Sequence, residues 1–227
     1  MRWNGRWMDW QRYAVIAAIF YEKKLCNDRS MSANLTAEQI REILQKAGNH
    51  PSDPRLAASL VEAAVLLPLI QEGGMWQVLY IRRSNHLKAH QGQVAFPGGM
   101  RDPGDASLEE TALRETYEEI GVPPQAVKIL GRLGQVPTPS GFLITPVVGV
   151  LIPPYTLTLQ PEEVDRAFTI PLDWLMQPGH RQERTIILNN RRVEGVVFFD
   201  EYDGELLWGV TGRITVNFIG MLSKEQI

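Results

Sequence analysis

Three glutamates, Glu115, Glu118 and Glu119, stand close together in the sequence just before Gly121. Glu115 and Glu119 are four residues apart, so on a helix they lie one turn apart on the same face. Hard divalent cations prefer carboxylate oxygens, and Mg²⁺ is typically held by one or two carboxylates together with substrate phosphates. A solvated helix face explains the same residues, because like charges one turn apart cost only about 0.2–0.5 kcal/mol per pair. The two readings are metal-assisted phosphate chemistry and an ordinary helix surface.

The residues around these glutamates predict the helix that carries them. Ser107 and Glu110 have the spacing of a capping box, and Gly121 followed by a proline-rich turn ends the helix. Its periodicity predicts an apolar stripe and places the three glutamates on roughly the opposite face. The stripe consists of Leu113, Tyr117 and Ile120. Arg114 and Glu118, four residues apart, are expected to pair.

A glycine turn precedes this helix. Gly98 and Gly99 let the backbone approach a phosphate or a metal ion closely, as residues with a Cβ cannot. The glycine spacing from Gly99 onward resembles a P-loop, but Asp105 and Ala106 stand where that motif needs Lys and Ser or Thr. The P-loop is therefore excluded.

The segment that contains the glycine turn and the three glutamates closely resembles the Nudix box, whose pattern is G-x5-E-x7-R-E-U-x-E-E-x-G-U, where U is aliphatic. The matching positions are Gly99, Arg114, Glu115, Glu118, Glu119, Gly121 and Val122. Asp105 replaces the first glutamate and stands eight residues rather than seven before Arg114, and Thr116 takes an aliphatic position. The resemblance implies that Glu115, Glu118 and Glu119, with Gly99, hold Mg²⁺ or Mn²⁺. It also implies catalytic roles for Glu118, Glu119 and Arg114.

A second motif precedes the box and resembles the signature of the coenzyme A pyrophosphatases within that family. It runs Arg83-Ser84-x3-Lys88-x3-Gly92-x3-Phe96-Pro97-Gly98-Gly99, with Lys88 where Arg is usual. The stretch from Trp208 to Gly212 is similar to a W-G-x-T-x-x-I segment near the end of that subfamily. The resemblance implies hydrolysis of the diphosphate bond of coenzyme A or a derivative, giving 3′,5′-ADP and 4′-phosphopantetheine. Arg83, Lys88 and Gly98 would then contact the substrate.

Other readings of the same motifs stay open. A Nudix hydrolase of another nucleoside diphosphate derivative would share every glutamate of the helix, and a non-catalytic Nudix-fold ligand sensor would tolerate their loss. Glu163 is a candidate general base, because Nudix enzymes often take one from a later loop, and an exposed turn explains this residue equally well.

The resemblance implies an α/β fold, the Nudix α/β/α sandwich with a mixed β-sheet. The residue patterns agree, with β-branched runs separated by Gly and Pro turns. We expect helices at 36–46 and 171–176 and after Trp208, and strands at 63–70, 76–83, 94–96, 127–133, 144–152 and 193–199. The last three strands are expected to complete the mixed sheet. Residues 56–70 could also form a helix, but their apolar content favours a buried strand.

At 227 residues the chain accommodates one well-buried domain with an extension. We expect the Nudix domain at 56–227, a helix and linker at 31–55, and an N-terminal extension at 1–30. The apolar run at 13–21 of this extension is too short to span a bilayer, and Asp9 weakens a signal-peptide reading. Another alternative is that Met31 is the native start. The domain is expected not to depend on residues 1–30.

Charge and composition limit the partners. A formal charge of −3 disfavours a general nucleic-acid binder, and no segment predicts a membrane span. A local basic rim could still attract phosphates; it consists of Arg82, Arg83, Lys88 and Arg101. Some of these residues are equally explained as ordinary solvated surface charges. Cys26 is the single cysteine, which excludes an intramolecular disulfide and fits a reducing cytoplasm. A homodimer is compatible with the resemblance.

Overall fold

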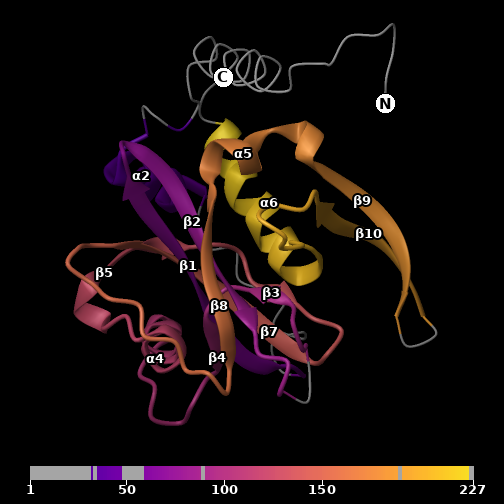
Figure 1. The fold of residues 1–227 in the computed structure, drawn as a ribbon, viewed down its shortest axis with the longest axis horizontal. Helices are drawn as coiled ribbons and strands as arrows, with labels where there is room; N and C mark the ends of the chain where they lie inside the picture. The colour runs from indigo at the N-terminus through magenta and orange to yellow at the C-terminus, as the bar shows by residue number, and fades with distance from the viewer. Residues whose placement is uncertain (1–31, 33–34, 48–58, 88–89, 189–190, 225–227) are drawn as a thin grey trace, which may run out of the picture.

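The computed structural model describes residues 32, 35–47, 59–87, 90–188 and 191–224 (Figure 1). The predicted extension at 1–30 and Lys88 lie outside these residues. The helices are α2 (Ala37–Ala47), α4 (Leu108–Ile120), α5 (Leu172–Met176) and α6 (Gly209–Lys224), with 3-10 turns η1 (Pro124–Ala126) and η2 (Pro178–His180). The strands are β1 (Val61–Glu72), β2 (Met75–Arg83), β3 (Val94–Ala95), β4 (Gly98–Met100), β5 (Val127–Arg132), β6 (Val136–Pro137), β7 (Phe142–Leu151), β8 (Val164–Pro171), β9 (Arg181–Leu188) and β10 (Arg191–Phe199).

Eight strands form one central sheet. Its main path runs β3-β2-β1-β7-β5, while β4 pairs with β1, β6 with β7 and β8 with β2. β1 and β7 run parallel, and the other paired strands run antiparallel. The predicted mixed sheet is confirmed.

The pleat of β2 shows how the two layers of helices cover this sheet. Trp76, Val78 and Tyr80 lie in one buried cluster together with residues of α2, α5 and α6. Leu79 and Ile81 point to the opposite face, into the cluster that α4 closes. Successive side chains of a strand alternate between its faces, so both faces of β2 are apolar and both are covered. The molecule is therefore the predicted α/β/α sandwich (Figure 1).

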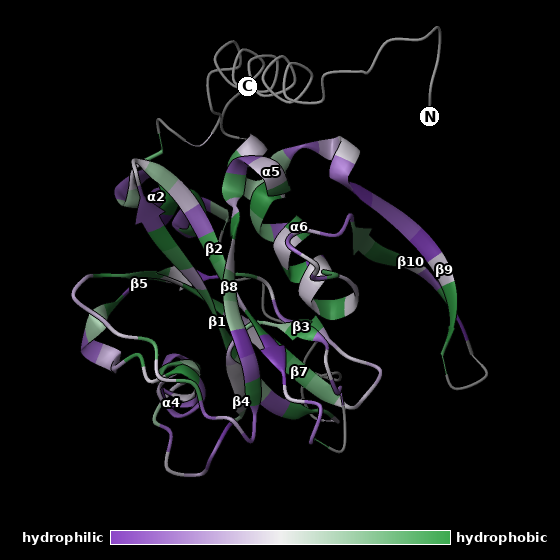
Figure 2. Ribbon diagram, in the orientation of Figure 1, coloured by the Kyte–Doolittle hydropathy of each residue, from purple (hydrophilic) through white to green (hydrophobic). Residues whose placement is uncertain are grey.

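The strand predicted at 193–199 forms, as β10, but does not complete the central sheet. In the described part of the chain it forms a separate two-stranded hairpin with β9, and Phe198 makes an isolated antiparallel bridge to Trp208. Val197 and Phe199 pack into the cluster beside α6, whereas β9 is mostly exposed, and Figure 2 shows much of β9 as hydrophilic. The strand β8, which the patterns did not predict, takes the position beside β2 instead. A β-branched run predicts a strand but does not specify its partner.

The predicted boundaries of the remaining elements agree closely with the structure. Thr36 caps α2, since its hydroxyl accepts from Gln39 N at 3.2 Å and its own N donates to Gln39 Oε1 at 2.8 Å. The segment before α2 is tied to the sheet by Trp76, whose indole N–H donates to Leu35 O at 2.7 Å. No helix in the described part of the chain is long and apolar enough to span a membrane.

Candidate active site

Helix α4 begins and ends where its capping residues predict. The Ser107 hydroxyl accepts from Glu110 N at 3.2 Å, and Gly121 adopts a left-handed φ of 72° while its N–H donates to Tyr117 O. One detail of the capping box differs from the prediction. The Glu110 carboxylate accepts from Ala106 N at 2.7 Å rather than from the backbone N–H of Ser107. It still satisfies a free donor at the start of the helix.

The face that α4 buries agrees only in part with the prediction, since Ile120 is buried as expected. Tyr117, expected in the apolar stripe, is 56% exposed, whereas Thr116 and Glu119 are 0% and 1% exposed. Ala112 and Thr116 let the helix pack closely, and the Thr116 hydroxyl donates to Ala112 O at 2.6 Å instead of remaining unpaired. The packing is set by these small residues, so the helix is rotated and Glu119 points inward. The three glutamates therefore do not share a solvated face.

Glu119 is held from two sides in this buried position. Gly98 N donates to its Oε2 at 2.9 Å, and Arg83 Nη1 lies 3.5 Å from its Oε1. Burial raises the pKa of Glu119 to about 8, although the Gly98 bond and the Arg83 charge oppose the shift. Nearby negative charges on Glu115 and Glu163 add to it. Near neutral pH this carboxyl therefore resists ionisation unless a cation reaches it.

Glu115 lies beside the glycine turn. A Cβ at Gly99 would stand 2.5 Å from the Glu115 carboxylate, and one at Gly98 would stand 2.4 Å from Ala64 O. Only glycine permits so close an approach of backbone to carboxylate. Burial raises the pKa of Glu115 too, against the attraction of Arg114, with Glu118 and Glu163 adding repulsion.

Arg114 connects the glutamates to the loop before the helix. Its Nη1 lies 2.9 Å from Glu115 and 3.1 Å from Glu118, so the predicted pairing with Glu118 is present. Its Nε and Nη2 donate to the two carboxylate oxygens of Asp105 at 3.1 and 3.0 Å. Such a bidentate contact fixes the plane of the guanidinium and hence the direction in which it presents Nη1.

Asp105 is the residue that departs from the Nudix box, and its environment explains the departure. It is buried and also accepts from Thr111 Oγ1 at 2.9 Å and from Asp102 N at 3.0 Å. The Arg114 guanidinium, chiefly, holds the pKa of Asp105 well below its usual range. Asp has a shorter side chain than the Glu of the Nudix box, and this chain has one more residue between that position and Arg114. The longer loop brings the shorter carboxylate within reach of the arginine.

Glu163 reaches the site from the loop that precedes β8. Gln160 N donates to Glu119 O at 2.9 Å, and Ser84 N donates to Glu163 O at 2.8 Å, so this loop is tied to the end of α4 and to the end of β2. The Glu163 side chain is exposed, and its charge raises the pKa of both Glu115 and Glu119. The structure brings Glu163 close to the helix glutamates. No local signal in the sequence indicates these loop contacts.

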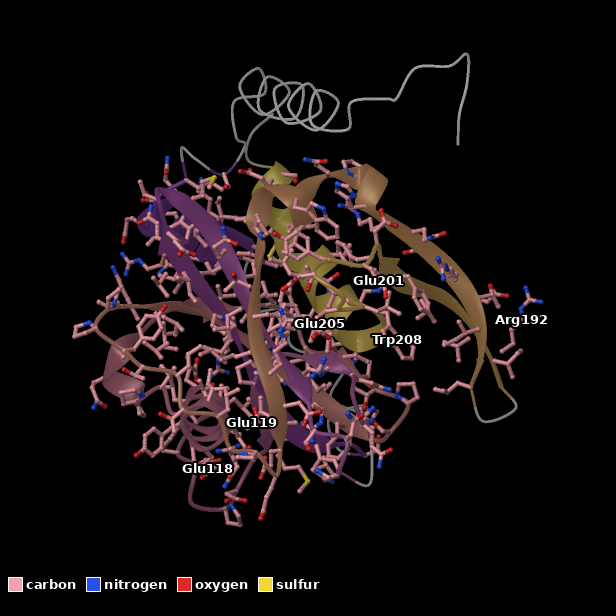
Figure 3. All side chains as sticks on the ribbon, in the orientation of Figure 1. Glu118, Glu119, Arg192, Glu201, Glu205 and Trp208 are labelled. Atoms are coloured by element: carbon pink, nitrogen blue, oxygen red, sulfur yellow. The ribbon has the colours of Figure 1, made fainter. Side chains whose placement is uncertain are left out.

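The expected basic rim is only partly present. Arg82 points to the opposite face of β2 from Arg83 and pairs with Glu205 at 3.1 Å, and Arg101 pairs with Glu62 at 2.9 Å. Figure 3 shows Glu205 well apart from Glu118 and Glu119. Of the described members of the rim, Arg83 is the one that contacts the helix glutamates.

The fit of a divalent cation depends on Glu118 and Arg114. As the side chains stand, no three His, Cys, Asp or Glu residues in the described ranges form a ready metal site. The reason is that Arg114 occupies the carboxylates of Glu115 and Glu118. Glu118 is 54% exposed and can rotate, while the pKa values of the half-buried Glu115 and the buried Glu119 are raised by burial and by neighbouring negative charges, including that of Glu163 on both. A cation would relieve this desolvation and repulsion, so the residues fit it.

The family model described as NUDIX domain matches residues 60–190. The chain belongs to the Nudix family. The protein named "Uncharacterized Nudix hydrolase NudL" from Photorhabdus laumondii is 40% identical over 164 residues, which cover 72% of this chain and 86% of that protein. The protein of the same name from Yersinia enterocolitica is 40% identical over 166 residues, covering 72% and 83%. Among solved structures, the MutT protein from Methanosarcina mazei Go1 is 18% identical with a TM-score of 0.46, over 73% of this chain and 94% of that one.

This Nudix hydrolase therefore acts on diphosphate bonds, and enzymes of the family need divalent metal ions.

Proposed function

We propose that this Nudix hydrolase cleaves the diphosphate bond of coenzyme A or one of its derivatives, giving 3′,5′-ADP and 4′-phosphopantetheine. The observation that carries the proposal is the position of Arg83. This residue opens the motif that resembles the coenzyme A signature, and its guanidinium lies 3.5 Å from the Glu119 carboxylate. The motif that resembles the coenzyme A signature therefore contacts the glutamates of α4 through Arg83.

Arg83 also has a donor to spare. Its Nε is buried and has no hydrogen-bond partner among the described residues. A buried N–H without a partner is costly, and a guanidinium matches the geometry of phosphate oxygens. An anionic substrate oxygen would satisfy it. In the proposed complex Arg83, Lys88 and the Gly98 turn contact the phosphates.

We further propose that Glu115, Glu118 and Glu119, with Gly99 beside them, hold Mg²⁺ or Mn²⁺. The raised pKa values of Glu115 and Glu119 support this assignment, as does the Gly99 backbone packed against Glu115. A bound divalent cation supplies Lewis-acid neutralisation of the charge that develops on the diphosphate oxygens.

The remaining residues have roles in orientation and proton transfer. Arg114, fixed by Asp105, aims its Nη1 between Glu115 and Glu118 and so sets the direction of both carboxylates. Glu163 is the proposed general base, because it is exposed and interacts electrostatically with both Glu115 and Glu119. It would take the proton of the water that attacks phosphorus as the bridging P–O bond breaks.

A substrate panel tests the proposal. Coenzyme A, an acyl-coenzyme A, ADP-ribose and nucleoside triphosphates are assayed in parallel with Mg²⁺ and with Mn²⁺, and the products are separated by chromatography. We expect 3′,5′-ADP from coenzyme A, with kcat/KM at least about tenfold above that for the nucleotides, which corresponds to about 1.4 kcal/mol of selectivity. Glu115→Gln, purified in the same way, controls for contaminating hydrolases. Preference for ADP-ribose or a nucleoside triphosphate would refute the coenzyme A assignment.

A further inference from the structure

The C-terminal helix α6 lies on the face of the sheet opposite α4, yet it contacts the strand that leads to the glycine turn. The Thr211 hydroxyl donates to Val94 O in β3 at 3.1 Å. Other hydroxyls of the helix bond within it: Thr215 Oγ1 donates to Thr211 O, and Ser223 Oγ to Ile219 O, each at 2.9 Å. The equivalent carbonyl for Thr211 belongs to Leu207 and already accepts from Phe199 N at 2.8 Å. Thr211 instead bridges α6 to β3.

A second contact from α6 reaches the same strand through an aromatic pair. Thr215 Oγ1 lies 3.0 Å from Tyr80 OH, and both residues are buried. The Tyr80 ring stacks on Phe96, with ring centroids 4.8 Å apart. Two residues of one helix therefore constrain a segment that begins at Val94 and includes Phe96.

This segment ends at the candidate active site. Pro97 O accepts from Leu66 N at 2.8 Å, and the next residue, Gly98, donates its N–H to Glu119 at 2.9 Å. A Cβ at Gly98 would stand 2.4 Å from Ala64 O, and Gly98 pairs with Val65 of β1, so the residue packs closely against that strand. The direction of the Gly98 N–H is set by this pairing and, through the preceding peptide, by how Val94 to Pro97 is held. Glu119 has few other contacts that could orient it, the ion pair with Arg83 being one.

We propose that Thr211 is a positioning residue for the active site, acting through β3 and Gly98 on the Glu119 carboxylate, with Thr215 supporting it through Tyr80 and Phe96. The inference rests on the proposed role of Glu119 in holding the cation. In this role the Thr211 hydroxyl acts through the backbone and not by contact with the substrate. It sets the place of a backbone donor on the other side of the sheet.

Thr211→Val tests the proposal, because it removes the hydroxyl and keeps the shape of the side chain. We expect kcat to fall roughly ten- to a hundredfold with KM nearly unchanged, as expected for a small displacement of a catalytic group. The affinity of the metal-free protein for Mn²⁺, followed by the electron paramagnetic resonance signal of free Mn²⁺, should weaken by roughly tenfold. Thr211→Ser keeps the donor and should restore both quantities to within about twofold of wild type.

Ser223→Ala is the matched control, since it removes a hydroxyl from the same helix whose bond, among the residues that the structure describes, is to Ile219 O within that helix. It should change neither kcat nor the Mn²⁺ affinity. If Thr211→Val lowers only the melting temperature and keeps wild-type kcat and Mn²⁺ affinity, Thr211 has a structural role alone and the proposal is wrong. Thr211→Ala replaces Thr211→Val in the same measurements if the valine variant does not fold.

The design separates this inference from the assignment of coenzyme A. The Mn²⁺ measurement needs no substrate, and kcat can be followed with whichever diphosphate of the panel the wild type cleaves. Loss of Mn²⁺ affinity in Thr211→Val would support the positioning role even if coenzyme A proves not to be a substrate. Unchanged affinity and turnover would overturn that role even if coenzyme A is cleaved.

Discussion

Replacing Glu119 with Gln should make the metal-free protein more stable at neutral and alkaline pH while abolishing its activity. Glu119 is almost completely buried, and its pKa rises from an ordinary value of 4.5 to about 8, chiefly because burial disfavours the charged form. The protonated carboxyl is thus the form that the metal-free fold prefers. Its contribution to stability is fully present below pH 4.5 and is lost as the pH rises towards 8.

The size of this effect follows from the two pKa values. Each pH unit between them corresponds to about 1.4 kcal/mol, so wild-type protein without metal loses up to about 4 kcal/mol on going from pH 4.5 to pH 8. Gln is neutral, has nearly the same volume and can still accept from Gly98 N, so it avoids this loss. At pH 8 we expect the variant to be about 2–4 kcal/mol more stable, or roughly 4–16 °C higher in melting temperature.

The assay is thermal and urea unfolding of both proteins in EDTA at pH 5 and pH 8, followed by activity at saturating Mg²⁺. The two proteins should differ little at pH 5, and kcat of the variant should be lower by roughly a thousandfold or more, because a metal ligand is lost. Glu115→Gln should lose similar activity, whereas Glu110→Gln, which keeps its capping bond, should retain it. Equal stability at pH 8 together with wild-type turnover would refute our reasoning about the buried carboxyl.

Three further predictions concern the surroundings of the site. Asp105→Asn should lower the free energy of unfolding at neutral pH by about 1–3 kcal/mol, since Arg114 loses a bidentate charged partner. Because the pKa of Asp105 is lowered from an ordinary value of 3.8, its contribution is lost only as the pH falls below about 4, so below that pH the variant should lose less stability to acid than the wild type; urea unfolding from neutral pH down into this acid range measures this. Arg83→Ala and Lys88→Ala should each mainly raise KM for coenzyme A in steady-state assays, and an unchanged KM would assign them to ordinary surface charge. Removing residues 1–30 should leave melting temperature and turnover nearly unchanged, because Ser32 and Leu35 make the described contacts that tie the N-terminal part to the domain; an inactive or insoluble truncation would contradict this.

The elements predicted best from the sequence are those whose ends are set by local chemistry. Ser107 and Gly121 delimit α4 because capping and a left-handed C-terminus involve residues only a few positions apart. β2 was predicted for a similar reason, since a strand with β-branched and aromatic residues between turns carries its own signal. Local signals of this kind do not depend on what the element packs against.

The errors concern which side of an element is buried and which strands pair. Periodicity placed Glu119 with the solvated residues and Tyr117 with the apolar ones, but the helix packs through Ala112 and Thr116, and small residues carry little weight in an apolar stripe. The pairing of β8 with β2 and the contact of the Glu163 loop with α4 both join distant parts of the chain, and β10 is outside the central sheet because it pairs with the neighbouring β9. Composition and spacing contain little information about such contacts.

The same face of α4 both packs against the sheet and carries a residue of the candidate active site. This explains why a side chain that destabilises the metal-free fold is found there. A residue in the buried position of Glu119 would stabilise the fold most as an apolar or neutral side chain. The sequence instead places there a carboxyl whose ionisation destabilises the fold, with Glu115 and Glu163 nearby and, among the described residues, Gly98 N and Arg83 as compensation. A ligand that binds the folded state but not the unfolded state stabilises the folded state. A cation that neutralises these carboxylates would therefore recover the stability that is lost when Glu119 ionises. Tight coupling between metal binding and stability near neutral pH is therefore expected from the position of this one glutamate.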